Sequence, residues 1–324
     1  MKKRLLAAVA APTAILSLVP ESDESPSGLS VLSSLPSGLA GALQAAILPK
    51  PRVASLQASV AMSEGAVNVS LCGVCHVEPL SSDAVRDLIT RCVNDPTERL
   101  MAVAVECDPQ TLSLIRIAHG AIKALPMDRV RREGSRLVRE ALFASRDVQN
   151  LARHEGVSLK TPTNAVLPRA IASHLEKDGV LWSDEMRVAA DAAEAAGTRV
   201  ICMGQSAAER LATTERPPQR SPSILSMAAG WLTAYSLCPG LDERSCDAAG
   251  VEAMNTAMRQ ALPARYRQLV TIPDERMAET LRTLCNELAR SGGTATGGPQ
   301  RIIVVVGAQH VPGLRKLLAG NEST

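Results

Sequence analysis

Four short apolar runs rich in β-branched residues constrain the fold of this 324-residue chain more than any other feature. They lie at residues 66–74, 99–107, 198–204 and 301–307, and helical patterns separate them. Short apolar runs of this kind are typical of buried strands, and strands that alternate with helices form parallel sheets. We therefore expect an α/β fold with a parallel-strand core.

The spacing of these runs also predicts the domain organisation. Residues 66–324 contain all four and are expected to form one α/β domain, with a helical insertion at about 207–270 between the third and fourth strands. Residues 1–65 are rich in Ser, Pro, Gly and Ala, and we expect them to form a targeting segment and flexible linker. The apolar run from Leu5 to Pro20 follows three basic residues, which fits the hydrophobic part of a signal peptide or an organelle presequence.

Several partner and cofactor classes are disfavoured. The run near the N-terminus is too short to predict a firm transmembrane helix, so any membrane association is expected through this segment alone. The net charge is only +2 and no basic face stands out, so we expect no nucleic-acid partner. No G-x-G-x-x-G turn follows the first strand, so we expect no nucleotide cofactor.

The eight cysteines contain a single C-x-x-C pair, Cys72 and Cys75. Without a second such pair, the spacing favours reduced, buried thiols over a zinc knuckle or a redox pair. Reduced thiols favour a reducing compartment.

Two segments with the same pattern, Gly-x-x-His-Val, follow the first and fourth strands. They place His76 and His310 just beyond strand ends, and Glu106 closes the second run. Ligands of parallel sheets bind beyond the carboxyl ends of the strands, so we expect these three side chains at one edge. Two imidazoles and a carboxylate are a suitable ligand set for zinc, manganese or cobalt.

The glycine of each segment, Gly73 or Gly307, is expected to allow a sharp turn or the close approach of a ligand. A bound metal would make hydroxide available near neutral pH, and a nearby carboxylate, Glu185 or Glu275, would accept the proton. Arg276 could hold a substrate carboxylate or a developing oxyanion. The alternatives are plainer: a hydrogen-bonded structural histidine in each segment, and a surface charge pair at 275–276.

The sequence also resembles the TraB/PrgY family, over roughly residues 66–320. The segments that carry the resemblance are GVCHVEPLSSDAVRDLI, AVAVECDPQTLSLI, DEMRVAADAAEAAGTRVICMG, IPDERMAETL and VVVGAQHVPGLRKLL, in that order. This family is similar to the TIKI metalloproteases and to the erythromycin-esterase and ChaN-like proteins. The resemblance implies a metal-dependent, peptidase-like hydrolase that acts on a peptide or small-molecule substrate, and a mitochondrial location, with the secretory pathway as the alternative.

Carried across, the resemblance implies a site made of His76, Glu106, Glu275 and His310, supported by Arg276 and Glu185. Two departures from the family pattern concern charged groups. Gln205 and Ser206 stand where the family has Asp-Arg, and Thr111 stands where it has an arginine. A non-catalytic binding or regulatory protein with a degenerate site is therefore the alternative prediction.

Overall fold

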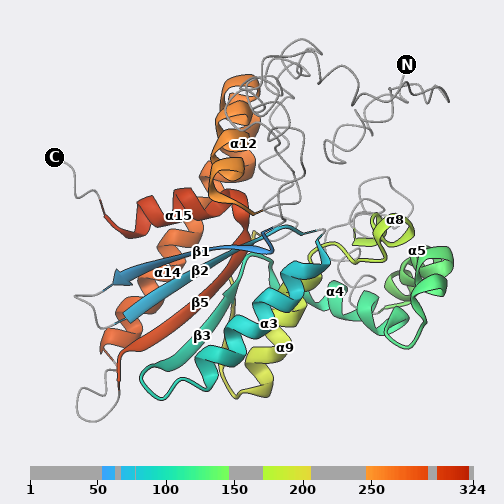
Figure 1. Ribbon diagram of the computed structural model, residues 1–324, viewed down its shortest axis with the longest axis horizontal. Helices are drawn as coiled ribbons and strands as arrows, with labels where there is room; N and C mark the ends of the chain where they lie inside the picture. Colours follow the sequence, from blue (N-terminus) through green and yellow to red (C-terminus); the bar gives the residue numbers. More distant parts are fainter. Residues whose placement is uncertain are drawn as a thin grey trace, which may run out of the picture. The chain divides into compact units, whose positions relative to one another are not determined.

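The computed structural model describes residues 53–62, 67–76, 78–145, 171–205, 246–290 and 298–320, which lie in one compact unit spanning residues 50–324. The expected targeting segment, up to residue 52, and residues 207–245 of the expected insertion lie outside the described residues. Figure 1 shows a sheet with helices on both sides, as an α/β fold requires. The strands are β1 (Ser55–Met62), β2 (Val67–Val74), β3 (Arg99–Val105), β4 (Arg199–Cys202) and β5 (Gln300–Gly307).

The sheet has the order β1-β2-β5-β3-β4. Strand β1 is antiparallel to β2, and the other neighbours are parallel. The four strands predicted from the apolar runs are therefore confirmed, together with their parallel pairing. Strand β5, the last along the chain, lies between β2 and β3, so that their three carboxyl ends are neighbours.

Strand β1 corrects the expected linker, because residues 55–62 belong to the sheet. All eight residues of β1 pair with β2. Its side chains alternate, with Leu56, Ala58 and Met62 packed against the core and Gln57 and Ser59 exposed. An edge strand with one solvated face needs only this alternation and not a continuous apolar run, which is why the composition resembled a linker.

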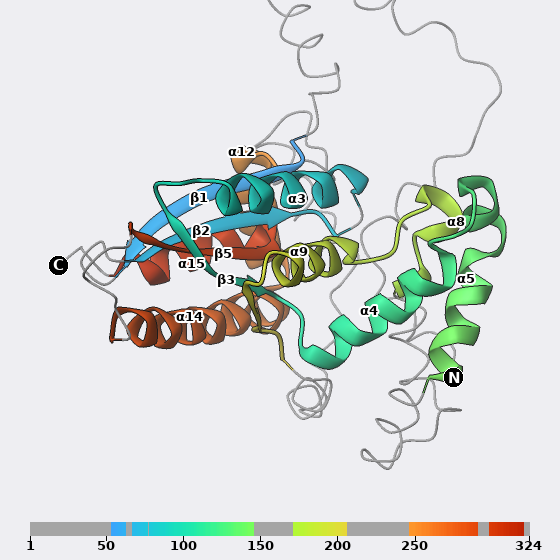
Figure 2. The same cartoon turned by 90° about the horizontal axis from the view of Figure 1, so that it is seen from below.

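Two pairs of helices enclose the sheet, as Figure 2 shows from below. On one face, α14 (Ile272–Arg290) and α15 (Val311–Leu318) pack against apolar side chains of β2, β3 and β5. On the other face, α3 (Pro79–Val93) and α9 (Asp184–Ala195) pack against the alternate side chains of the same strands. Valine and isoleucine therefore fill both sides of the central strands, as in a buried parallel sheet.

A second group of helices follows β3. It contains α4 (Pro109–Ile122), α5 (Met127–Ala144) and α8 (Leu175–Asp178), which share an apolar cluster of their own. No helix among the described residues has both the length and the apolar character of a membrane-spanning segment.

Among the described residues between β4 and β5, the helices are α12 (Ala248–Ala261), α13 (Pro263–Tyr266) and α14. A five-residue π-helix, Arg267–Thr271, joins α13 to α14. Pro273 at the start of α14 has no N–H to donate, and a wider turn just before it leaves room for the proline ring. The next residue, Asp274, is buried and faces the end of β5.

Candidate active site

The strand register brings the two histidine segments, residues 73–76 and 307–310, side by side. In the β2–β5 pair, Val74 lies opposite Gly307. On the other side of β5, Glu106 follows directly after β3, and its backbone N–H donates to the carbonyl of Val305 at 3.1 Å. The expectation that both histidines and Glu106 meet at one edge of the sheet agrees with these positions.

His310 is held between two carboxylates and is 6% exposed. Its Nδ1 lies 2.6 Å from Oδ1 of Asp274, and its Nε2 lies 3.2 Å from Oε1 of Glu106. A turn of 3-10 helix, Ala308–His310, carries the imidazole, and Asn255 of α12 donates a hydrogen bond of 3.0 Å to the carbonyl of Gln309 in that turn.

His76 repeats this arrangement in a more open position, with its side chain 25% exposed. Its Nδ1 lies 2.5 Å from Oε1 of the buried Glu185, and its Nε2 lies 3.9 Å from Oε2 of Glu106. The Trp182 ring lies against the imidazole, with 5.6 Å between ring centroids. The next residue, Ser183, adopts a left-handed conformation with φ of 60° and donates its N–H to the carbonyl of His76 at 3.0 Å. A non-glycine residue in this region stores backbone strain beside the site.

The two glycines allow the histidine segments to interlock. A Cβ on Gly73 would lie 2.5 Å from Cγ2 of Val311 and 2.9 Å from Cα of Ala308 in the second segment. A Cβ on Gly307 would lie 3.0 Å from Nε2 of His76 in the first. Gly73 therefore makes room for protein atoms and not for a ligand, which corrects its expected binding role, whereas Gly307 does border the site.

The charges of the site compensate one another. Burial alone would lower the pKa of His310, but the carboxylates of Glu106 and Asp274 outweigh it and raise that pKa to about 10. Burial likewise acts to lower the pKa of His76, and Glu185 and Glu106 raise it above its ordinary value. Burial would raise the pKa of Glu106, yet the two imidazoles and the hydrogen bond from the Gly307 N–H bring it well below the usual range.

The structure does not bring Glu275 and Arg276 to this site in the expected roles. Both side chains are exposed on α14, while the residue before them, Asp274, is buried and hydrogen-bonded to His310. Asp274 is thus the site residue that the sequence reasoning missed. It lies in helical register with Met277, Ala278 and Leu281, all buried, and a carboxylate in such an apolar stripe was the available signal.

Thr111, which stands where the resemblance implies an arginine, is buried at the start of α4. Its hydroxyl donates to Oδ2 of Asp108 at 2.5 Å, and Oδ1 of the same carboxylate accepts from the backbone N–H of Gln110 and Thr111 at 3.0 Å. The pair therefore forms a helix cap and contributes no cation to the site.

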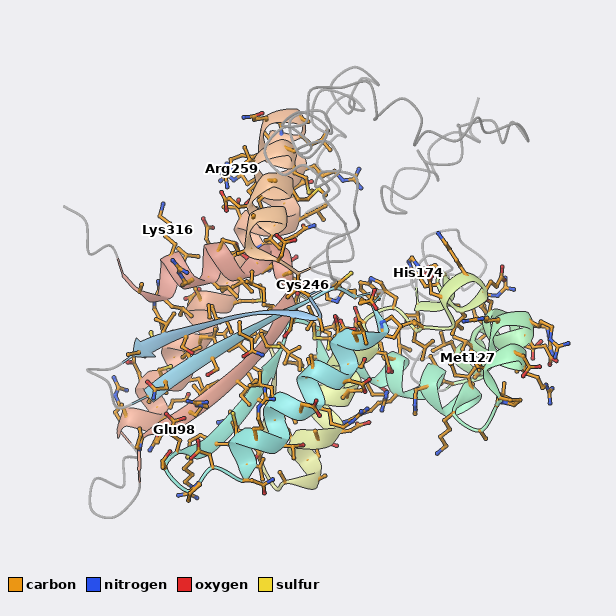
Figure 3. The ribbon with its side chains drawn as sticks, in the orientation of Figure 1. Glu98, Met127, His174, Cys246, Arg259 and Lys316 are labelled. Atoms are coloured by element: carbon orange, nitrogen blue, oxygen red, sulfur yellow. The ribbon has the colours of Figure 1, made fainter. Side chains whose placement is uncertain are left out.

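The other described histidines lie away from the strand ends. His174, labelled in Figure 3, precedes α8 in the helical group, and His119 lies on α4. Among the described residues, no group of three or more His, Cys, Asp or Glu side chains has the mutual arrangement of a metal site as it stands. The sequence matches no model of a known protein family, and a search of curated proteins finds no match.

Proposed function

We propose that this protein is a metal-dependent hydrolase of the TraB type that acts on a peptide or amide bond. The observation that carries the proposal is the convergence of two imidazoles on one carboxylate. His76 and His310 each use Nδ1 to bind a buried carboxylate and present Nε2 to Glu106.

The donor atoms of these residues are of the kinds that a divalent cation binds. Metal-binding histidines usually donate Nδ1–H to a carboxylate, which fixes the tautomer and leaves Nε2 for the metal. Glu185 and Asp274 are placed for that role. The ligands would be Nε2 of His76, Nε2 of His310 and a carboxylate oxygen of Glu106, a set that suits zinc, manganese or cobalt. When bound, the cation would polarise a substrate carbonyl and lower the pKa of a water.

The chain's own groups would prepare the site for this chemistry. Glu185 and Asp274 orient the two rings, and Glu106, whose side chain is 26% exposed, would contribute a carboxylate oxygen that a cation and the solvent can reach. The Trp182 ring packs against the His76 ring, with 5.6 Å between their centroids. The absent side chain of Gly307 leaves space next to the Nε2 atom of His76.

A non-catalytic binding or regulatory protein on the same scaffold is the second candidate. Two observations favour it. The imidazoles and carboxylates already pair with one another, and the capping role of Thr111 leaves its position without the arginine that the resemblance implies. Such a protein would bind a peptide without cleaving it.

Turnover of a peptide mixture separates the two candidates. Purified protein loaded with zinc, manganese or cobalt is incubated with a defined peptide library, and products are identified by mass spectrometry. We expect metal-dependent cleavage that Glu106→Gln and His310→Ala abolish, whereas His119→Ala on α4 retains it. Peptide binding without cleavage, under every metal, would favour the second candidate.

A further inference from the structure

Strand β1 leaves one of its edges open. All eight of its residues pair with β2 on the inner side, in a register without a bulge. In the part of the chain that the structure describes, no strand pairs with the outer side, and the backbone of residues 55–62 has no hydrogen bonds beyond those to β2. The N–H and C=O groups that point outward are therefore available to another strand.

Strand β1 also lacks the features that usually keep edge strands from pairing. Natural proteins protect such edges with charged side chains, proline, bulges or a very short strand. The sequence of β1, SLQASVAM, contains no charged residue and no proline, and the strand is as long as β2. This edge is therefore suited to accept a strand and not to repel one.

A groove runs along the open edge, between β1 and the helices α15 and α12 (Figure 1). Its volume is about 540 Å³, and one wall is formed by the consecutive residues Leu56, Gln57 and Ala58. Successive side chains of a strand point to opposite faces of the sheet, so a space bordered by all three lies at the edge and not over one face. Val311 and Pro312 of α15 give the groove an apolar part.

Two cations border this groove without an ion-pair partner. Arg315 and Lys316 are exposed on α15, and neither forms a salt bridge with a described residue. Figure 3 shows the Lys316 side chain extending away from its helix. Among the described lining residues the one carboxylate is Glu252 on α12, so the α15 side of the groove is positive. Such a surface favours a partner that carries carboxylates.

We propose that the groove binds an extended acidic segment of another protein, which adds a strand to the outer edge of β1. Main-chain hydrogen bonds to β1 supply affinity, and carboxylates of the segment beside Arg315 and Lys316 supply selectivity. The binding requires neither metal nor turnover at the histidine site.

A second copy of this chain fits the edge less well. Two β1 strands paired about a two-fold axis would place the same patch of each chain against its equivalent. The cations of one α15 would then face those of the other, and like charges in contact oppose association. The charge of the groove therefore favours an acidic partner over self-association.

Binding of a defined peptide tests the proposal. The probe is a fluorescein-labelled octapeptide with threonine at every second position and two valines and two glutamates at the others, because threonine and valine favour an extended chain. Fluorescence anisotropy is measured with the full chain in EDTA, so that the result does not depend on the proposed metal site. We expect saturable binding that is about tenfold weaker when lysine replaces both glutamates. Methylation of every backbone nitrogen of the peptide should abolish the binding.

Hydrogen exchange and two double variants locate the binding site. Bound peptide should slow amide exchange in residues 55–62, because the outward N–H groups of β1 gain partners. Arg315→Ala/Lys316→Ala should weaken binding about tenfold. Arg91→Ala/Arg290→Ala removes two exposed cations from α3 and α14 and should bind the peptide as wild type does. A circular dichroism spectrum confirms that each variant is folded.

Three results would overturn the proposal. Equal binding of the methylated peptide would exclude strand addition, and no binding at about 1 mM peptide would exclude the acidic partner. If the mass of the protein rose with its concentration, and exchange in residues 55–62 slowed without any peptide, a second copy would be the occupant of the edge.

Discussion

The two histidine segments have the same spacing and the same partners in kind, but they differ in depth. His310 is nearly enclosed, 3.2 Å from Glu106, and is held by Asp274 from the α14 side of the sheet. His76 is a quarter exposed, 3.9 Å from Glu106, and is held by Glu185 from the α9 side. The comparison indicates different roles for the two histidines. His310 is buried and fixes the position of Glu106, whereas His76 is partly exposed and borders the space where a ligand would enter.

The difference follows from the position of the strands. Strand β5 is central, with parallel neighbours on both sides, whereas β2 is bordered by the edge strand β1. The segment after β5 continues directly into α15, packed beneath the sheet, so His310 has protein around it. The two glycines differ accordingly, because Gly73 packs against the second segment and Gly307 faces the imidazole of the first.

Among the substitutions considered, removal of the carboxylates that bind the two histidines should lower the free energy of unfolding the most. Asp274→Ala leaves the buried, charged His310 without its Nδ1 partner, and we expect a loss of about 3 kcal/mol in the free energy of unfolding. Glu185→Ala affects the more exposed histidine, and we expect about 1–2 kcal/mol. Urea denaturation of both variants measures the difference. If both variants lost the same free energy of unfolding, His310 and His76 would not differ in burial as described.

Metal should stabilise the folded chain through both segments at once. With zinc at about one hundred times its dissociation constant, we expect the free energy of unfolding to rise by about 2.7 kcal/mol. A chelator should reverse the gain, and His76→Ala and His310→Ala should each remove it, since both imidazoles are needed. Thermal unfolding with and without metal measures this, and His119→Ala is the matched control that should behave as wild type. Full stabilisation in either site variant would argue for a different binding site.

Alanine substitutions at Gly73 and Gly307 should affect different properties, the first mainly the stability of the fold and the second mainly metal binding. Gly73→Ala places a methyl group against the backbone of Ala308, and we expect a cost of about 1–3 kcal/mol in the free energy of unfolding. Gly307→Ala meets side chains of the site at 3.0–3.5 Å and not backbone atoms, so we expect a smaller cost, of about 1 kcal/mol, but weaker metal binding. Calorimetric titration with zinc, together with urea denaturation, distinguishes the two outcomes. Gly120→Ala on α4, where the space is open, should not destabilise the chain.

The smallest effects are expected at the exposed pair on α14. Glu275→Gln and Arg276→Ala should change the free energy of unfolding by less than about 0.5 kcal/mol, since both side chains face solvent. Turnover and metal content should also remain unchanged. A large loss of turnover in folded Arg276→Ala protein would restore the role that the sequence predicted for it.

Much of the fold could be predicted from the sequence because it depends on local pattern. The apolar runs mark β2, β3, β4 and β5, and their alternation with helices predicts that these four strands are parallel. Strand β1 was missed, although Leu56, Ala58, Val60 and Met62 are apolar at every second position, which is the pattern of a half-buried strand. The surrounding Ser- and Ala-rich composition masked that alternation.

The site was predictable only in part, because its residues come from distant segments. His76, His310 and Glu106 could be found since each follows a strand, and strand ends share an edge. The choice between Asp274 and Glu275 depends on the helical register of α14, which only the position relative to Met277 and Leu281 indicates. His310 is more buried than His76 because of the order of the strands in the sheet, and no local sequence pattern predicts that order.

The metal content of the purified protein tests the central claim most directly. Elemental analysis of protein loaded with zinc and then dialysed should find one cation per chain in wild type and in His119→Ala, and background levels in His76→Ala and in His310→Ala. Wild-type protein at background, or site variants that keep the full complement, would contradict the claim that these two imidazoles share one metal with Glu106.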